Sequence, residues 1–149
     1  MKNLFTAISL IFIVQLSFGQ ELIPYEENGK FGHKDSIGNV IVQPKYDRVK
    51  EFYQVVAPVN IGGSYHVTEW GYTSFKGGKW GIIDQTEKEI APIKYDYIGT
   101  FHEGRALVAI KEKHGYIDTT GKEVVPVIYI LEAKDIKDIN HNTDRKGKD

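Results

Sequence analysis

The chain has 149 residues, enough for a single domain, and its 41% hydrophobic and 26% charged residues are typical of a globular protein. Nineteen basic and twenty acidic side chains leave a formal net charge of -1. This balance argues against a nucleic-acid-binding protein, because recognition of phosphates depends on an excess of basic surface. The chain has no cysteine, which excludes disulfides, thiolate metal sites and cysteine nucleophiles.

Residues 1–19 have the pattern of a secretory signal peptide. A basic second residue precedes an apolar run over residues 4–18, and the small residues Ser17 and Gly19 stand where a signal peptidase would cut before residue 20. The run is shorter than the roughly 20 residues that cross a membrane as a helix, so an uncleaved anchor is the less favoured alternative. The pattern predicts export to the periplasm, the cell surface or the medium, a lead-in over residues 20–28, and no membrane-embedded segment after cleavage.

The rest of the chain repeats itself. Three similar segments end in a glycine: Gly29–Gly32, Gly78–Gly81 and Glu112–Gly115. Each final glycine is followed after three residues by an aspartate and after fourteen by a tyrosine, which are Asp35, Asp84, Asp118, Tyr46, Tyr95 and Tyr129. The glycines are 49 and 34 residues apart, so the first unit carries fifteen additional residues, placed by the alignment at about 60–74. So many correspondences at fixed offsets indicate a tandem repeat.

The repeated residues resemble the WG-repeat (KWG-repeat) family. The second unit is the most similar, and its matching residues are Lys79, Trp80, Gly81, Asp84, Pro92, Tyr95, Asp96, Phe101, Glu103, Gly104, Ala106 and Val108. The resemblance covers residues 29–131 as two full units and one half unit. Phe31 and His114 replace the tryptophan in the other units, and Glu87 replaces a turn glycine. Because members of this family are similar to one another in being β-rich, the resemblance implies an all-β repeat domain.

The residues themselves also indicate strands joined by tight turns. Short runs rich in β-branched and apolar residues, such as Ala106–Ile110, favour strands. Segments that begin with aspartate and end with glycine, at 35–38 and 118–121, favour turns. Apart from residues 131–139, the body has no apolar stripe with helical spacing. The sequence therefore predicts an antiparallel meander of tandem repeats, which forms an open or partly closed sheet.

We expect structural roles for the repeated residues. Each repeated glycine would let an aromatic ring from a neighbouring strand lie on bare backbone, and Trp80, Tyr46 and Tyr95 would supply the rings. Asp47 and Asp96 would close turns by accepting backbone N–H groups. The repeated prolines would stand near strand ends, where a missing N–H group is tolerated.

Metal binding and catalysis are the alternatives for the repeated aspartates Asp35, Asp84 and Asp118. Calcium needs several oxygens that converge on one point, whereas these residues are one repeat apart, so turn formation is favoured and no metal or cofactor is expected. The five histidines form no recognised ligand set, and phosphate-binding loops and nucleophile elbows are absent from the sequence. The sequence predicts a protein without catalytic residues; the alternative is a small hydrolase using carboxylates of the Asp84 and Asp118 type.

The insertion at about 60–74 is the segment that the repeat does not require. The insertion and the residue just beyond it supply the candidate binding residues, which are the aromatic side chains Tyr65, Trp70, Tyr72 and Phe75. Exposed aromatic faces on a loop stack against sugar rings and extended peptides. In the alternative, the insertion lengthens a hairpin and Trp70 covers an open end of the sheet, since a short repeat array needs covered ends.

The two ends of the array differ in their expected character. His33 and Lys34 replace two isoleucines of the second unit, which predicts a polar terminal strand that protects an edge. Residues 124–131 would form an open edge, available for strand addition by a partner or for self-association. The polar composition of residues 132–149 predicts a disordered tail.

The leading functional hypothesis is an exported, non-catalytic β-repeat protein that binds a protein partner. The alternative is a glycan- or cell-wall-binding module that uses the aromatic insertion. Both hypotheses require a surface for an unknown partner, and neither requires a cofactor.

Overall fold

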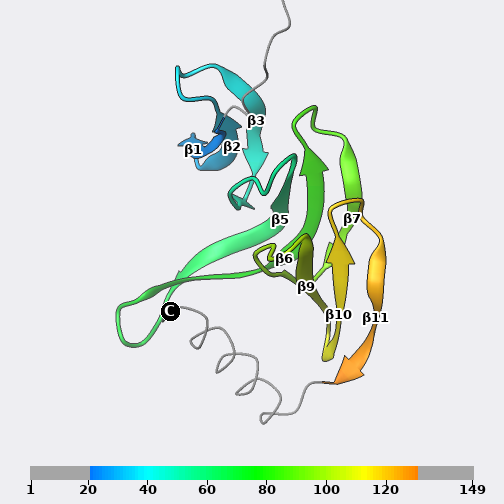
Figure 1. The fold of residues 1–149 in the computed structure, drawn as a ribbon. Helices are drawn as coiled ribbons and strands as arrows, with labels where there is room; N and C mark the ends of the chain where they lie inside the picture. The colour runs from blue at the N-terminus through cyan, green and yellow to red at the C-terminus, as the bar shows by residue number, and fades with distance from the viewer. Residues whose placement is uncertain (1–20, 131–149) are drawn as a thin grey trace, which may run out of the picture.

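The structure, a computed structural model, describes residues 21–130, which form eleven β-strands (Figure 1). Their bounds are β1 Ile23–Glu27, β2 Lys30–Lys34, β3 Val40–Tyr46, β4 Arg48–Val49, β5 Val56–Val67, β6 Thr73–Asp84, β7 Glu89–Tyr95, β8 Tyr97–Ile98, β9 Arg105–Ile110, β10 Lys113–Asp118 and β11 Glu123–Ile130. The strands make three antiparallel sheets, in the orders β1-β2-β3, β4-β5-β6-β7 and β8-β9-β10-β11, and none of these sheets is closed. The described residues contain no helix, so the prediction of an all-β repeat fold is confirmed.

The three sheets share one strand pattern. Tyr25 in β1 pairs with Gly32 in β2 just as Val59 in β5 pairs with Gly81 in β6. β1 is therefore the counterpart of β5, and residues 20–28, expected as a lead-in, supply a strand to the first sheet. The second and third sheets add a short outer strand, β4 or β8, which follows directly on the last strand of the preceding sheet. Each sequence repeat consequently spans two sheets.

The repeated glycines make room for a bulge in the following strand. A step of two residues along β2, from Phe31 to His33, corresponds to a step of four along β3, from Tyr46 to Val42. The same shift recurs between β6 and β7 and between β10 and β11. A Cβ atom on Gly32 would lie 2.2 Å from the carbonyl oxygen of Val42. The backbone of the bulged strand fills the space beside this glycine, so the expectation of an aromatic ring there is wrong.

The bulge also explains the prolines. Pro44, Pro92 and Pro126 lie inside β3, β7 and β11, between the paired residues on either side of the register shift, and not near strand ends as the sequence suggested. A bulged residue need not donate a hydrogen bond to the neighbouring strand, so proline is tolerated there. Gly115 completes the pattern, because a Cβ atom on it would lie 2.5 Å from the carbonyl oxygen of Val125.

Two clusters of buried side chains hold the three sheets together. The cluster between the first two sheets contains Val42, Tyr46, Val49, Val59 and Ile83. The cluster between the second and third sheets contains Val56, Trp80, Ile82, Ala91, Tyr95, Ile98, Phe101, Ala106, Val108 and Ile117. Tyr46 and Tyr95 occupy equivalent places and are only 4% and 1% exposed. Each such ring buries about 150–250 Å², so the repeated tyrosines are central to the packing of one unit on the next.

A repeated aspartate connects adjacent strands. Asp47 accepts a hydrogen bond from Lys30 Nζ at 2.6 Å and another from the backbone N–H of Gly62 at 2.7 Å. Asp96 makes the same two contacts, with the corresponding lysine of β6 and with the backbone N–H of Lys111. Lys30 lowers the pKa of Asp47, mainly through its hydrogen bond to the Asp47 carboxylate. These aspartates accept backbone N–H groups, as expected, but from the neighbouring hairpin and not from a turn of their own.

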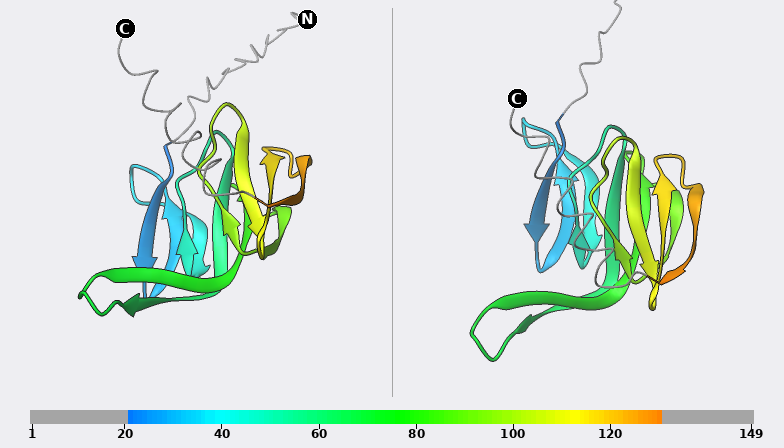
Figure 2. Two further views of the ribbon diagram at one scale, coloured as in Figure 1. Left: turned by 90° about the horizontal axis from the view of Figure 1, so that it is seen from below. Right: turned by 60° about the horizontal axis from the view of Figure 1, so that its bottom comes forward.

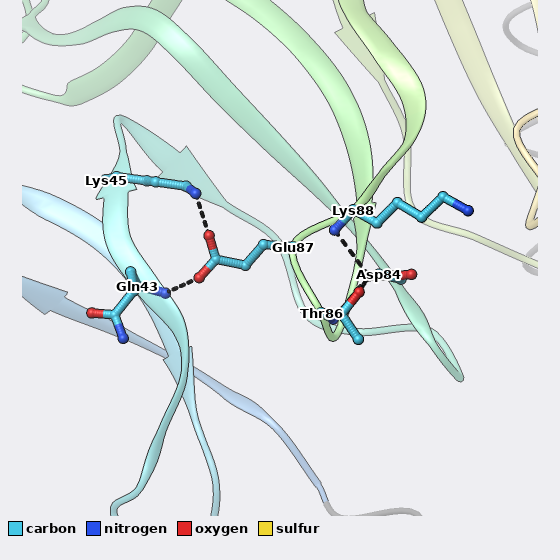
Figure 3. Close-up of polar contacts among 6 residues, drawn as sticks. All are labelled: Gln43, Lys45, Asp84, Thr86, Glu87 and Lys88. Carbon is cyan, nitrogen blue, oxygen red and sulfur yellow. Dashed lines mark hydrogen bonds and ion pairs between the residues drawn. The ribbon is translucent and has the colours of Figure 1, made fainter.

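Polar contacts at a turn also join the first two sheets (Figure 3). Glu87 has a left-handed backbone, with φ of 65°, at the position where the other units have glycine. Its carboxylate accepts a hydrogen bond from the backbone N–H of Gln43 at 2.8 Å and forms an ion pair with Lys45. The equivalent lysine of the second unit, Lys94, pairs with Glu123 at 3.1 Å. A glutamate of the next unit therefore meets this lysine at both junctions.

His33 does not protect an edge, contrary to the expectation from the sequence. β1 pairs with β2 along its whole length, so β2 is the central strand of the first sheet. The His33 side chain is fully buried, and its Nε2 donates a hydrogen bond to the carbonyl oxygen of Lys50 at 2.8 Å. Its ring packs edge-on against Phe52 at 4.7 Å. Burial lowers the pKa of His33, which favours the neutral imidazole in this place.

The hairpin of β5 and β6 extends well beyond the sheet to which it belongs (Figure 1). Its strands stay paired from Val56 and Asp84 as far as Val67 and Thr73. Figure 2 shows this hairpin projecting away from the three stacked sheets. The insertion of the first unit thus forms a protruding structure, and the expectation that it lengthens two strands is confirmed.

Several predictions from the sequence lie outside the described residues. They concern the signal peptide over 1–19, the polar tail over 132–149 and the helical stretch at 131–139, and they stay predictions. Within residues 21–130, the chain has no helix long and apolar enough to span a membrane.

Candidate functional site

A groove of about 770 Å³ opens where the three sheets meet the base of the long hairpin. Its walls come from Pro24 of β1, from β4 and the loop that follows it, from Pro58 of β5, from positions 75–80 of β6, and from Asp96, β8 and the loop that follows β8. Six aromatic side chains line the groove: Phe52, Tyr53, Phe75, Trp80, Tyr97 and Phe101. A concave site of this size, lined by aromatic rings and a few polar groups, has the dimensions of a ligand pocket.

The aromatic rings of the groove hold one another in place. Tyr53 stacks on Phe101 with ring centroids 5.5 Å apart, and its hydroxyl oxygen accepts a hydrogen bond from the backbone N–H of Gly104 at 3.1 Å. Phe75 meets Trp80 edge-on at 6.2 Å. Because packing restricts these rings, a ligand would meet a largely preformed surface.

Arg48 enters the groove from the short strand β4. Its guanidinium lies over the rings of Tyr65 and Phe75, 5.6 Å and 5.2 Å from their centroids. Such contacts hold a cation against an aromatic face without using its N–H donors. Among residues 21–130, Arg48 has neither an ion pair with a carboxylate nor a side-chain hydrogen bond. Its donors therefore remain available to a ligand.

With Arg48 and the exposed Lys76, Lys50 is one of three cations that line the groove. Its ammonium lies over the rings of Trp80 and Tyr97, at 5.2 Å and 5.0 Å from their centroids, and donates a hydrogen bond to the carbonyl oxygen of Ile98 at 2.6 Å. Burial, and then the charge of Arg48, lower the pKa of Lys50. No carboxylate in the described part of the chain forms an ion pair with Lys50.

The four aromatic residues predicted as binding residues divide into two pairs. Phe75 lines the groove and is partly buried, and Tyr65 packs edge-on against it at 5.1 Å. Trp70 and Tyr72 lie in and beside the hairpin turn and are 83% and 74% exposed. With so much of its side chain exposed, Trp70 does not cover the end of a sheet, which removes the capping role considered for it.

The protruding hairpin begins at a cluster of glycines held by Asn60. This side chain is fully buried; its Oδ1 accepts the backbone N–H of Gly63 at 3.1 Å, and its Nδ2 donates to the carbonyl oxygen of Gly77 at 3.3 Å. A Cβ atom on Gly78 would lie 2.4 Å from Asn60 Oδ1. The two strands can therefore approach Asn60 only because Gly63 and Gly78 lack side chains.

The repeated contacts also fix the limits of the insertion. Gly62 and Lys111 both have a positive φ, of 87° and 54°, and the backbone N–H of each bonds to the repeated aspartate of its unit. In the second unit the chain turns at this point, whereas in the first unit it continues. The insertion is therefore residues 63–77, three residues later than the expected 60–74, and Asn60 belongs to the repeat. We call residues 63–77 the arm.

The turn aspartates have the structural role that the sequence favoured. Asp84 Oδ1 accepts backbone N–H groups of Thr86 and Lys88, and Asp118 Oδ1 accepts those of Thr120 and Lys122 (Figure 3 shows the first turn). In each turn the threonine hydroxyl is the main cause of a lowered aspartate pKa. Among the described residues, no three His, Asp or Glu side chains are placed to hold a metal ion. These hydrogen bonds are those of turn-forming aspartates, and the absence of catalysis stays a prediction.

Sequence reasoning missed every groove residue except Phe75, and among those missed are Arg48, Lys50, Trp80 and Tyr97. The repeat pattern gave Trp80 only a packing role and gave Tyr97 no role. A signal was nevertheless present, because Arg48 and Lys50 stand where the second unit has Tyr97 and Gly99. The repeat does not require a cation at either position. This departure from the pattern could have indicated the groove.

Comparison with known families agrees with this structure. The pattern of the WG containing repeat family matches residues 32–65, 80–113 and 115–129, which together exceed half of the chain. Comparison with curated proteins and with solved structures gave no significant match. The three matched segments are two full units and a partial one, as the sequence predicted. The chain therefore belongs to the WG containing repeat family.

Proposed function

We propose that this protein is an exported, non-catalytic binding module that holds a segment of a protein partner in the aromatic groove. The observation that carries the proposal is the convergence of six aromatic rings and three cations on one cavity of about 770 Å³. The cations are Arg48, Lys50 and Lys76, and none of them forms an ion pair within residues 21–130. Aromatic rings together with arginine are the side chains that contribute most to protein recognition.

Two edge strands support a protein partner. β4 and β8 are the outer strands of the second and third sheets, and Arg48 and Tyr97, which belong to them, line the groove. The carbonyl oxygen of Ile98 in β8 faces the ammonium of Lys50. An extended peptide binds well to such a surface, since edge strands offer main-chain hydrogen bonds and nearby rings offer contacts for its side chains.

The export part of the proposal rests on the signal-peptide pattern of residues 1–19, which precede the described residues. Mass spectrometry of protein recovered outside the cytoplasm tests it. Cleavage before Gln20 is the expected result, and an intact N-terminus on the recovered protein would contradict it.

Substitution of Thr100 tests the groove as the partner-binding surface. Thr100 is exposed and lines the groove, so Thr100→Trp fills it without disturbing a buried side chain. Thr73→Trp is the matched control, because Thr73 is exposed on the arm and does not line the groove. In a pull-down from envelope extract, the partner captured by the wild-type chain and by Thr73→Trp should be lost with Thr100→Trp. Equal capture by all three proteins would contradict the proposal.

Glycan binding by the arm is the second candidate function, and the exposure of Trp70 and Tyr72 at its tip favours it. Exposed rings on a projecting hairpin can stack against sugars. Trp70→Ala is the matching test: loss of binding to insoluble cell-wall polysaccharide, with an unchanged thermal midpoint, would support this function. Retained polysaccharide binding by Trp70→Ala would contradict it.

A further inference from the structure

We propose that Arg48 and Lys50 form an anion receptor in the groove and select an acidic segment of the protein partner. This inference rests on the proposed function and adds the chemistry of the ligand. The receptor consists of two cations held by aromatic rings within one cavity, and the missing element is a carboxylate that would pair with them.

Arg48 and Lys50 differ from the lysines of the sheets that form ion pairs. The described residues contain four ion pairs, made by Lys30, Lys45, Lys79 and Lys94. Those four lysines connect strands or neighbouring units. Arg48 and Lys50 are both partly buried, and within residues 21–130 neither forms an ion pair with a carboxylate. A charge that is withdrawn from water without a counter-ion binds an anion more favourably than a fully hydrated one does.

The geometry of Arg48 suits the binding of a carboxylate. Tyr65 and Phe75 support the guanidinium through their ring faces, which leaves its fork of N–H donors free. A guanidinium fork matches the two oxygens of a carboxylate, and the two groups then form parallel hydrogen bonds. Arg48 would therefore supply orientation as well as charge.

The position of Lys50 is fixed from two sides. His33 donates a hydrogen bond to the carbonyl oxygen of Lys50, and the Lys50 ammonium itself donates to the carbonyl oxygen of Ile98. An ammonium has three donors, so two remain for a ligand. Lys50 and Arg48 are near enough for the charge of one to affect the other, and a single acidic segment can meet both.

The carboxylates that line the groove do not neutralise this receptor. Asp96 is occupied by Lys79 and by the backbone N–H of Lys111. Glu51 is exposed at the groove and forms no ion pair within residues 21–130. Glu51 would repel an acidic ligand, so its removal should strengthen binding while removal of either cation weakens it.

The experiment measures peptide binding to the full chain in a Trp70→Phe background, where Trp80 in the groove is the remaining tryptophan. The probe is a decapeptide of alternating glutamate and tyrosine, and the neutral comparison has glutamine in place of each glutamate. A third arm uses polygalacturonate, which carries carboxylates on a sugar chain. Titrations at low and high salt follow Trp80 fluorescence.

The proposal predicts that the acidic peptide binds at least tenfold more tightly than the neutral one and that salt weakens its binding. Arg48→Gln and Lys50→Met should each weaken it about tenfold or more, with thermal midpoints that show folded protein. Glu51→Gln should strengthen it, and Lys88→Gln, an exposed cation outside the groove, should leave it unchanged.

Equal binding of the acidic and neutral peptides would overturn the inference, as would unchanged binding by Arg48→Gln and Lys50→Met. Binding of polygalacturonate but not of the acidic peptide would also overturn it and would assign the receptor to a glycan. These outcomes are separate from a failure of the proposed function, which would appear as partner capture that Thr100→Trp leaves intact.

Discussion

Asn60 accepts the backbone N–H of Gly63 at the base of the arm, with 3.1 Å between Oδ1 and the amide nitrogen. On its other side Asn60 donates to the carbonyl oxygen of Gly77 at 3.3 Å. One buried amide thereby joins the two strands at the point where the first unit departs from the second. Asn60 thus fixes the base of the arm, and the arm places Phe75 and Tyr65 beside Arg48.

Asn60→Ala should destabilise the protein by about 1–3 kcal/mol, because it leaves a backbone donor and a backbone acceptor without their partner in a buried place. Urea denaturation measures the change in the free energy of unfolding. Hydrogen exchange should also become faster at the Gly63 amide. Ser64→Ala, an exposed change on the arm, is the control and should alter stability by less than about 0.5 kcal/mol. Equal effects of the two substitutions would contradict the role given to Asn60.

Gly121 and Gly38 form a matched pair for testing how the third unit packs on the second. Both have a positive φ, of 83° and 97°, so alanine at either position should cost roughly 1–2 kcal/mol of backbone energy. A Cβ atom on Gly121 would also lie 2.0 Å from the carbonyl oxygen of Ile90, whereas one on Gly38 would meet nothing within 4 Å. Gly121→Ala should therefore be clearly more destabilising than Gly38→Ala in thermal or urea unfolding. Similar losses would show that the contact with Ile90 is not tight.

The sequence predicted the architecture well because the repeat places residues at equal offsets in equivalent surroundings. Tyr46 and Tyr95 are both buried between sheets, as expected. The role of the repeated glycines was not predicted, although the proline inside each following strand is a sequence mark of a bulge. The arm was placed three residues too early because Gly62 and Lys111, which share a backbone conformation, are unlike in sequence.

The groove was harder to predict than the fold. Its residues come from all three sheets and the arm, so no spacing along the chain brings them together. Of the predicted binding residues, Phe75 lines the groove, but Trp70 and Tyr72 were selected by composition alone and lie at the arm tip. Arg48 and Lys50 could be noticed only as departures from the repeat, and only the structure shows that both departures face one cavity.

Acid should weaken the fold through its turn aspartates. The hydroxyl of Thr120, together with backbone N–H groups, lowers the pKa of Asp118 below its ordinary value of 3.8. A lowered pKa means that the ionised group adds stability above the ordinary pKa, and that this contribution disappears as the pH falls through the folded-state value. The difference in unfolding free energy between the wild type and Asp118→Asn should therefore be larger at pH 7 than at pH 3. The exposed substitution Glu112→Gln is the control, and a difference for Asp118→Asn that grows on acidification would contradict this account.

The last strand, β11, exposes a tyrosine whose counterparts in the first two units are buried. Tyr129 is 53% exposed, although its counterparts Tyr46 and Tyr95 are almost fully buried, and Ile128 beside it is 59% exposed. Exposed apolar residues on an edge strand favour association with another chain. We therefore expect concentration-dependent self-association of the wild-type protein, measured by sedimentation equilibrium.

Ile128→Asp should weaken that association, because the carboxylate would have to lose its water on contact with a second copy. Ile37→Asp is the matched control, since Ile37 is 78% exposed and lies in the turn between β2 and β3. Equal loss of association in both variants would point to a general effect of charge. A wild-type protein that stays monomeric over the whole concentration range would show that β11 does not recruit a second copy, and the partner for this strand would then have to be a different protein.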